Sequence, residues 1–313
     1  MKRQPKILYL DQFAASNMSA NNGIRSEARE LVEVAVRKGK IICPIPMEHF
    51  IETSGRSIYN AVEHHDWFKS VSGRKQFFPW EIIVANEIMN WTKRRISKIY
   101  VPNYLTILRN NIDFANEDIF NKMNEARQKY QDFVNQEKLN LNEIRNHIRM
   151  TGQKHNHDHM FIKALNSLTY QKYKEEFKSV AYGKRYPYNI MEIGHKKEER
   201  IAYLLCLKRF TCSDFMSIVN DINKFGFEHI PSLDIYYKMK FYFSLENLEE
   251  KANDDIDIER ISSGLYLSDI MFVDYKQKIA VKKLELDKKY NTFVYSAKQN
   301  DIKSFIEYIE TII

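Results

Sequence analysis

The sequence has few of the residues that interrupt, cross-link or anchor a fold. Among 313 residues there are only 9 glycines and 7 prolines, so we expect few flexible linkers and a largely helical chain. The three cysteines, Cys43, Cys206 and Cys212, show no metal-binding spacing and no paired framework, which indicates a reducing compartment. No apolar run approaches the roughly 20 residues of a membrane span, and none near the N-terminus suits a signal peptide. We therefore expect a soluble, cytoplasmic protein.

Composition and charge leave several classes of partner open. Hydrophobic residues make up 44% of the chain, with 19 tyrosines and 19 phenylalanines, which is enough for a large core in one or two domains. The 48 basic residues outnumber the 41 acidic residues and give a formal net charge of +7. This excess permits a nucleic-acid partner through phosphate contacts but does not require one.

The N-terminal region follows the pattern of a strand, a helix and a second strand. Residues 7–10 form a bulky apolar run that predicts a central strand, and Asp11 follows it directly. Helical spacing over residues 24–38 and a second apolar run over residues 40–46 complete a right-handed parallel unit. Asp11 is then expected at the carboxyl edge of the sheet, where α/β proteins bind ligands, and Glu52 begins a helix at the same edge.

A second set of acidic residues lies near the C-terminus. The apolar run 270–273 predicts a buried strand, with Asp269 before it and Asp274 after it. Residues 254–257 place carboxylates at the start of a helical pattern, where they suit the positive end of the helix dipole, and we expect Asp254 and Asp255 to cap that helix. Taken alone, the stretch also fits a capped helix and a solvated turn.

Considered together, the acidic residues predict a metal site. The expected topology brings four groups of acids to one edge of a parallel sheet: Asp11, Glu48 with Glu52, the acids of residues 254–257, and Asp269 with Asp274. Carboxylates that are forced together repel one another unless cations hold them. A divalent cation at this edge would supply the missing positive charge.

The middle of the chain gives weaker signals. Helices are expected over residues 55–100, 103–149 and 160–225, with a break at residues 151–154 and a loop at residues 182–188, and no internal repeat is visible. Three histidines within residues 155–159 could bind a transition metal, although on a helix the middle one points away from the face that the other two share. Arg149 and His155 also resemble the loose Arg-x5-His spacing of HEPN-type ribonucleases, which leaves open a ribonuclease that works without metal.

Several short segments resemble the PIN-like nuclease superfamily. Leu10, Asp11 and Gln12 resemble the Leu-Asp-Gln with which the first strand ends in one of its subgroups. Other segments resemble its Pro-x2-His-x2-Glu-Thr motif, its Pro-Ser helix start and its late acidic helix and strand, through Pro46, His49, Glu52, Thr53, Pro231, Ser232, Asp254, Asp257, Tyr266, Asp269 and Asp274. Over residues 6–95 and 229–313, which the resemblance covers, the chain departs from the subgroup by having Phe13 in place of Asn and Leu267-Ser268 in place of a single Cys.

The resemblance implies a fold and an activity. The fold would be α/β, with a PIN-like parallel sheet flanked by helices in residues 1–100 and 229–313, and with a large helical insertion in residues 101–228. The activity would be hydrolysis of phosphodiester bonds with Mg²⁺ or Mn²⁺, on RNA ahead of DNA. Such a nuclease would suit a toxin or defence effector with a regulatory protein partner. The alternative is an inactive PIN-like scaffold that binds a partner protein through the insertion.

The resemblance also implies roles for individual residues. Asp11, Glu52, Asp257 and Asp274 would be catalytic. The metal ligands would be Asp11, Asp257 and Asp274, with Asp269 supporting them. Cationic side chains near these acids are candidates for contacts with the substrate phosphates, namely Arg56, Arg260 and Lys276.

Overall fold

The computed structural model describes residues 5–11, 24–46, 49, 58–97, 105–107, 157–186, 196–246 and 252–313, with isolated positions between 118 and 132. Contacts divide the chain into two compact units. The sheet unit comprises Met1–Pro79, Tyr104–Gln131 and Ile256–Ile313, and the helical unit comprises Trp80–Asn103 and Asp132–Asp255. The sequence-based division at residues 100 and 229 differs from these units, because it assigns residues 80–100 and 229–255 to the domain that contains the sheet and residues 104–131 to the helical insertion.

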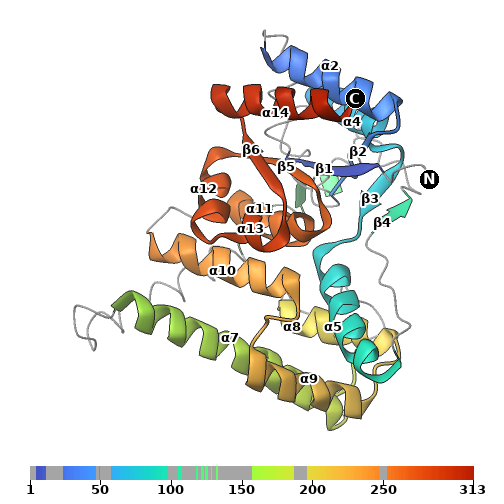
Figure 1. The fold of residues 1–313 in the computed structure, drawn as a ribbon. Helices are drawn as coiled ribbons and strands as arrows, with labels where there is room; N and C mark the ends of the chain where they lie inside the picture. The colour runs from blue at the N-terminus through green and yellow to red at the C-terminus, as the bar shows by residue number, and fades with distance from the viewer. Residues whose placement is uncertain are drawn as a thin grey trace. The chain divides into compact units, whose positions relative to one another are not determined.

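A parallel sheet of four strands lies at the centre of the sheet unit (Figure 1). The strands are β1 (Lys6–Leu10), β2 (Ile41–Ile42), β5 (Ile270–Val273) and β6 (Phe293–Ser296), in the order β2-β1-β5-β6. Every neighbouring pair is parallel. All four residues of β5 are buried, as expected for a strand that is covered on both faces. The structure therefore confirms the α/β class and the two predicted central strands.

Alternate side chains of the central strands point to opposite faces of the sheet. Leu8 of β1 and Phe272 of β5 belong to a hydrophobic cluster with α2 (Ile24–Arg37) and α14 (Gln299–Ile312). These two helices lie side by side over one face of the sheet (Figure 1). Because Tyr9 alternates with Leu8 and Leu10, its side chain points to the other face.

The end of α11 (Ala252–Gly264) approaches this other face closely. A Cβ atom at Gly264 would lie 2.9 Å from the Tyr9 ring and 3.1 Å from the Met271 side chain, so glycine is what allows the approach. The helix residues one and two turns before Gly264 are Arg260 and Asp257. Close packing at Gly264 thus brings both of them toward the central strands.

The other elements of the sheet unit are α4 (Ile58–Ser72), α12 (Tyr275–Lys283), α13 (Leu286–Tyr290) and an antiparallel pair, β3 (Lys75–Phe77) with β4 (Leu105–Ile107). The prediction of helix throughout residues 55–100 is wrong at β3. Gly73 and Arg74 both adopt positive φ angles, 57° and 59°, and this left-handed pair ends α4.

The helical unit contains α5 (Trp80–Ser97), α7 (His157–Ala181), α8 (Lys197–Leu207), α9 (Cys212–Phe225) and α10 (Pro231–Leu245). The start of α10 is fixed by the buried Glu87 of α5, whose carboxylate accepts from the backbone N–H and the hydroxyl of Ser232 at 3.0 and 2.7 Å. A carboxylate in this position also compensates the helix dipole. Within the described residues, no helix is both long and apolar enough to cross a membrane.

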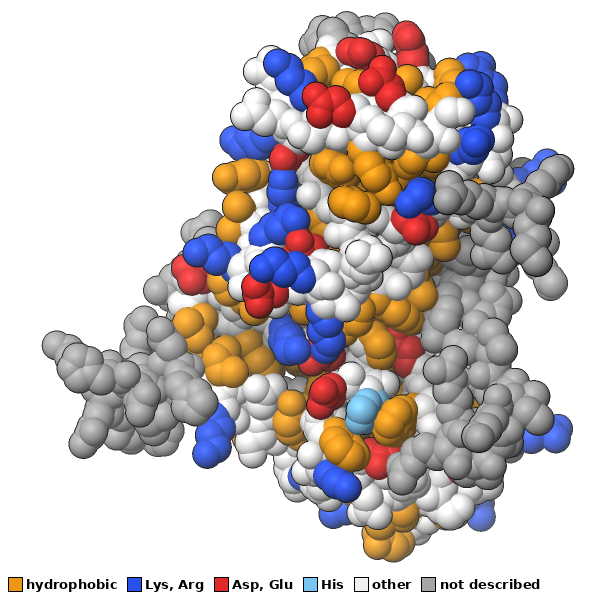
Figure 2. All heavy atoms as spheres, viewed as in Figure 1, with side chains coloured by type: hydrophobic (Ala, Val, Ile, Leu, Met, Phe, Trp, Pro, Cys, Tyr) orange, Lys and Arg blue, Asp and Glu red, His pale blue; other side chains and the backbone are white. Residues whose placement is uncertain are grey.

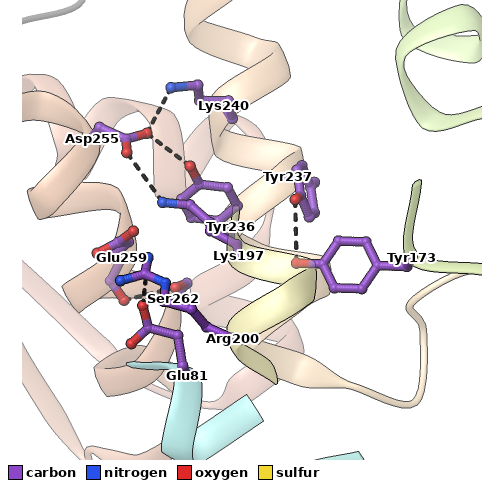
Figure 3. Close-up of polar contacts among 10 residues, drawn as sticks. All are labelled: Glu81, Tyr173, Lys197, Arg200, Tyr236, Tyr237, Lys240, Asp255, Glu259 and Ser262. Atoms are coloured by element: carbon purple, nitrogen blue, oxygen red, sulfur yellow. Dashed lines mark hydrogen bonds and ion pairs between the residues drawn. The ribbon is translucent and has the colours of Figure 1, made fainter. Parts of the chain in front are cut away.

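A buried charge cluster ties α8 and α10 to the first turns of α11 (Figure 3). The Asp255 carboxylate accepts from Lys240 Nζ at 2.6 Å and from the Tyr236 hydroxyl at 2.8 Å, and it lies 3.5 Å from Lys197 Nζ. Burial favours a raised pKa for Asp255, but the two ammonium groups outweigh burial and hold that pKa below its ordinary value. Asp255 is therefore a buried ion-pair partner, and the expectation that it caps α11 is wrong.

Candidate functional site

Two of the predicted acids lie at the carboxyl ends of the central strands. Asp11 follows β1, and its backbone N–H donates to the carbonyl of Phe272 in β5 at 2.8 Å. Asp274 follows β5 and caps α12, because its Oδ1 accepts from the backbone N–H of Gln277 at 2.9 Å. Since β1 and β5 are adjacent and parallel, both carboxylates belong to the same edge of the sheet.

Arg260 connects Asp11 to the acid that α11 provides. Its Nη1 lies 3.3 Å from Oδ1 of Asp11 and 3.3 Å from Oδ1 of Asp257. Asp257 and Arg260 are three residues apart on one helix and therefore share a face. The Arg260 side chain is fully buried and Asp11 is only 6% exposed, so this ion pair forms away from bulk water.

Gln277 extends the contacts from Asp257 to Asp274. Its Nε2 donates to Oδ2 of Asp257 at 3.2 Å, while its backbone N–H donates to Asp274. Both carboxyl oxygens of Asp257 are thus engaged, one by Arg260 and the other by Gln277. We call these five residues, Asp11, Arg260, Asp257, Gln277 and Asp274, the acid network.

The five residues of the acid network carry a net negative charge, because they include three carboxylates and one guanidinium group, which pairs with Asp11 and Asp257. Carboxylate and amide oxygens are the ligands that Mg²⁺ and Mn²⁺ take, so the chemical type of these donors suits such a cation. Arg260 nevertheless relieves part of the repulsion that the sequence argument assigned to a metal ion. In the part of the chain that the structure describes, no three His, Cys, Asp or Glu side chains are grouped closely enough to hold a metal by themselves.

Asp269 does not belong to this network. It precedes β5, where its carboxylate accepts from the backbone N–H of Ile7 at 2.9 Å and lies 4.0 Å from Lys6 Nζ. The whole length of β5, four residues at roughly 3.3 Å each, separates Asp269 from Asp274. The prediction that Asp269 supports the metal ligands is wrong, because a residue that precedes a parallel strand lies at the amino edge of the sheet.

The predicted phosphate contact of Arg260 is also wrong. Its side chain is buried between Asp11 and Asp257 and is not available to a substrate at the surface. Lys276, by contrast, lies in the first turn of α12 and is partly exposed. Its role as a phosphate contact stays a prediction.

Some predicted residues lie outside the described part of the chain: Glu52, Arg56, Arg149 and His155. Of the histidine group, His157 and His159 lie at the start of α7.

His49, which shares a motif with Glu52, is buried, and its ring centroid lies 4.8 Å from that of Phe68 and 6.5 Å from that of Tyr9. The histidine of the motif therefore lies near Tyr9 of β1, two residues before Asp11.

Gln277 is the site residue that the sequence argument missed. The spacing from Asp274 to Gln277 is that of a capping box, in which an acceptor at the helix start is followed three residues later by Glu or Gln. That signal locates the start of α12. It does not reveal that the Gln277 side chain turns to Asp257, which is 20 residues earlier in the chain.

We compared the chain with protein-family models, with curated proteins and with solved structures, and none of the three comparisons found a match.

Proposed function

We propose that the chain is a metal-dependent, PIN-like nuclease that hydrolyses phosphodiester bonds, with RNA as its substrate. The acid network carries the proposal, because β1, α11 and β5 each contribute a carboxylate to one assembly at the carboxyl edge of a parallel sheet. The sequence resemblance supports the choice of the same three acids. In this proposal the sheet unit is the nuclease domain, and the helical unit is the insertion that selects substrate or binds a regulatory partner.

Each member of the network has a defined task in the proposal. Asp11, Asp257 and Asp274 hold Mg²⁺ or Mn²⁺ through carboxylate oxygens. The bound ion supplies a water of lowered pKa and stabilises charge at the phosphate. Arg260 keeps Asp11 and Asp257 together, so that two carboxylates from distant segments are already adjacent before the cation binds. Glu52 is expected to orient the water.

Cationic side chains near the network support a polyanionic substrate. Figure 2 shows Lys and Arg side chains over α12 and α13, with Asp and Glu side chains among them, and α12 begins just beyond Asp274. Lys278 and Lys282 of α12 form ion pairs with Asp301 and Asp287. Lys276 is partly exposed and lies closest in sequence to the acids. Carboxylates alone repel phosphate, so a nuclease site needs such cations together with its metal.

The proposal is tested by incubating the purified protein with single-stranded RNA and single-stranded DNA in the presence of Mn²⁺, and again with EDTA. We expect cleavage of RNA that requires Mn²⁺ and is lost in Asp11→Asn and Asp257→Asn. Asp269→Asn is the matched control, because it makes the same chemical change at the opposite edge of the sheet, and it should cleave at the wild-type rate. Full activity in both network variants would refute the assignment.

One observation favours a second candidate function. Arg260 already places a positive charge between Asp11 and Asp257, as in a pseudo-enzyme whose acidic site has become structural. In that case the protein is an inactive scaffold that binds a partner protein through the helical unit. Absence of cleavage with either nucleic acid, together with a stable protein partner that the helical unit captures, would select the scaffold over the nuclease.

A further inference from the structure

The side-chain amide group of Gln277 is buried, and among the described residues only its nitrogen has a hydrogen-bond partner. Gln277 is 1% exposed, and its Nε2 donates to Oδ2 of Asp257. Its Oε1 is also buried and has no hydrogen-bond partner among the described residues. A buried carbonyl oxygen without a hydrogen bond raises the free energy of the folded state. We therefore expect a hydrogen-bond donor or a cation beside Oε1.

The orientation of this amide is determined by chemistry. A carboxylate accepts hydrogen bonds and cannot donate, so the NH₂ group of Gln277 must face Asp257. Oε1 is bonded to the same carbon as this nitrogen, so it lies near the Asp257 carboxylate while its lone pairs stay available to another partner. The backbone N–H of the same residue binds Asp274, which places Gln277 between two of the three acids.

We propose that Oε1 of Gln277 is a neutral oxygen ligand of the divalent cation that the acid network binds. Carbonyl oxygens of amide side chains are ordinary ligands of hard cations, and they add a ligand without adding repulsion among the carboxylates. The inference rests on the proposed metal dependence and adds a ligand that the sequence resemblance does not contain. Gln277 then has two tasks, since its nitrogen orients Asp257 while its oxygen binds the ion.

A purely structural role for Gln277 makes different predictions. The cap of α12 uses only the backbone N–H of Gln277 and the side chain of Asp274, so it survives replacement of the Gln277 side chain. If the side chain served only to orient Asp257, a carboxylate at position 277 would repel Asp257 and weaken metal binding. If Oε1 is a ligand, a carboxylate oxygen at the same place binds the cation at least as well.

The test is a titration with Mn²⁺ in which free Mn²⁺ is followed by electron paramagnetic resonance, in the absence of nucleic acid. Gln277→Met, which has a similar shape but no oxygen, should bind Mn²⁺ at least about 10-fold more weakly than the wild type, because loss of even a group behind the ligands usually costs about 10- to 100-fold. Gln277→Glu should bind at least as tightly as the wild type. Gln299→Glu adds the same charge at an exposed position at the start of α14, and it should leave Mn²⁺ affinity within about twofold of the wild type.

The possible results separate this inference from the proposal on which it rests. Wild-type protein that binds no Mn²⁺ would overturn the metal-dependent function, and the ligand assignment with it. If Gln277→Met binds Mn²⁺ as tightly as the wild type, the ligand assignment is overturned and the metal-dependent function is not. The same holds if the affinity of Gln277→Glu for Mn²⁺ is as low as that of Gln277→Met. If Gln277→Met does not fold, as judged from its thermal unfolding in EDTA, the comparison of Gln277→Glu with Gln299→Glu decides by itself.

Discussion

Arg260 and Asp11 are 249 residues apart in the sequence, yet Nη1 of Arg260 lies 3.3 Å from Oδ1 of Asp11. The same nitrogen lies 3.3 Å from Oδ1 of Asp257. One buried guanidinium thus joins the end of β1 to α11 and keeps two carboxylates together. Arg260 thus offsets part of the repulsion between carboxylates for which the sequence argument required a metal ion.

Replacing Arg260 with glutamine should destabilise the protein strongly. The change leaves two adjacent carboxylates without their cation, and breaking a buried ion pair costs about 3–5 kcal/mol. Urea unfolding measures the loss. Arg29→Gln is the matched control, because Arg29 pairs with Glu33 on the partly exposed face of α2 and its loss should cost no more than about 1 kcal/mol. Equal unfolding midpoints for the two variants would contradict the role of Arg260.

Alanine at position 264 should also destabilise the protein, although alanine favours helices. The helix preference is worth about 1 kcal/mol, whereas a new methyl group 2.9 Å from the Tyr9 ring forces a packed core to shift at about 1–3 kcal/mol. The free energy of unfolding in urea decides the sign. A Gly264→Ala variant that is more stable than the wild type would show that α11 is not held against β1 as described.

Asp255→Asn should destabilise the helical unit. The change leaves Lys197 and Lys240 buried without the carboxylate that they share, and we expect a loss of about 3–5 kcal/mol in the free energy of unfolding. Asp66→Asn serves as the control, since Asp66 is 64% exposed and its contact with Lys69 should contribute less than about 1 kcal/mol. Similar stabilities of the two variants would contradict the buried cluster.

Lys276→Ala should weaken RNA binding without a change in sequence preference. A lysine that contacts phosphate contributes a salt-dependent, sequence-independent term, so the slope of log affinity against log salt should fall by about 1. Fluorescence anisotropy in EDTA measures this binding in the absence of cleavage. Lys303→Ala changes an exposed lysine of α14, on the other face of the sheet, and should leave the slope unchanged. The same slope in both variants would remove Lys276 from the substrate contacts.

The sequence predicts those features of the site that depend on local order in the chain. Asp11 and Asp274 directly follow apolar runs, so the direction of each strand places them at the carboxyl edge. The same rule should have excluded Asp269, which comes before its strand. Treating the two acids that flank β5 as equivalent ignored the direction of the chain.

Other features of the site depend on packing that no local pattern reveals. Apolar residues are buried on several sides of α11, including Ile256, Ile258 and Ile261, so periodicity does not show that Arg260 faces β1. The contact of Gln277 with Asp257 likewise joins two helices that are separated by β5. The predictions for Glu52 and Arg56 concern residues outside the described part of the chain.

The most direct test of the metal-dependent nuclease is Mn²⁺-dependent cleavage of single-stranded RNA by Asp257→Asn, measured beside the wild type and Asp269→Asn. Asp257 is the central member of the acid network, with one carboxyl oxygen near Arg260 and the other near Gln277. Changing a residue behind the metal ligands usually lowers activity about 10- to 100-fold, and loss of a direct ligand should lower it further. We therefore predict that Asp257→Asn cleaves RNA at least about 100-fold more slowly than the wild type. Asp269→Asn should cleave at the wild-type rate. Wild-type rates in Asp257→Asn would contradict the account.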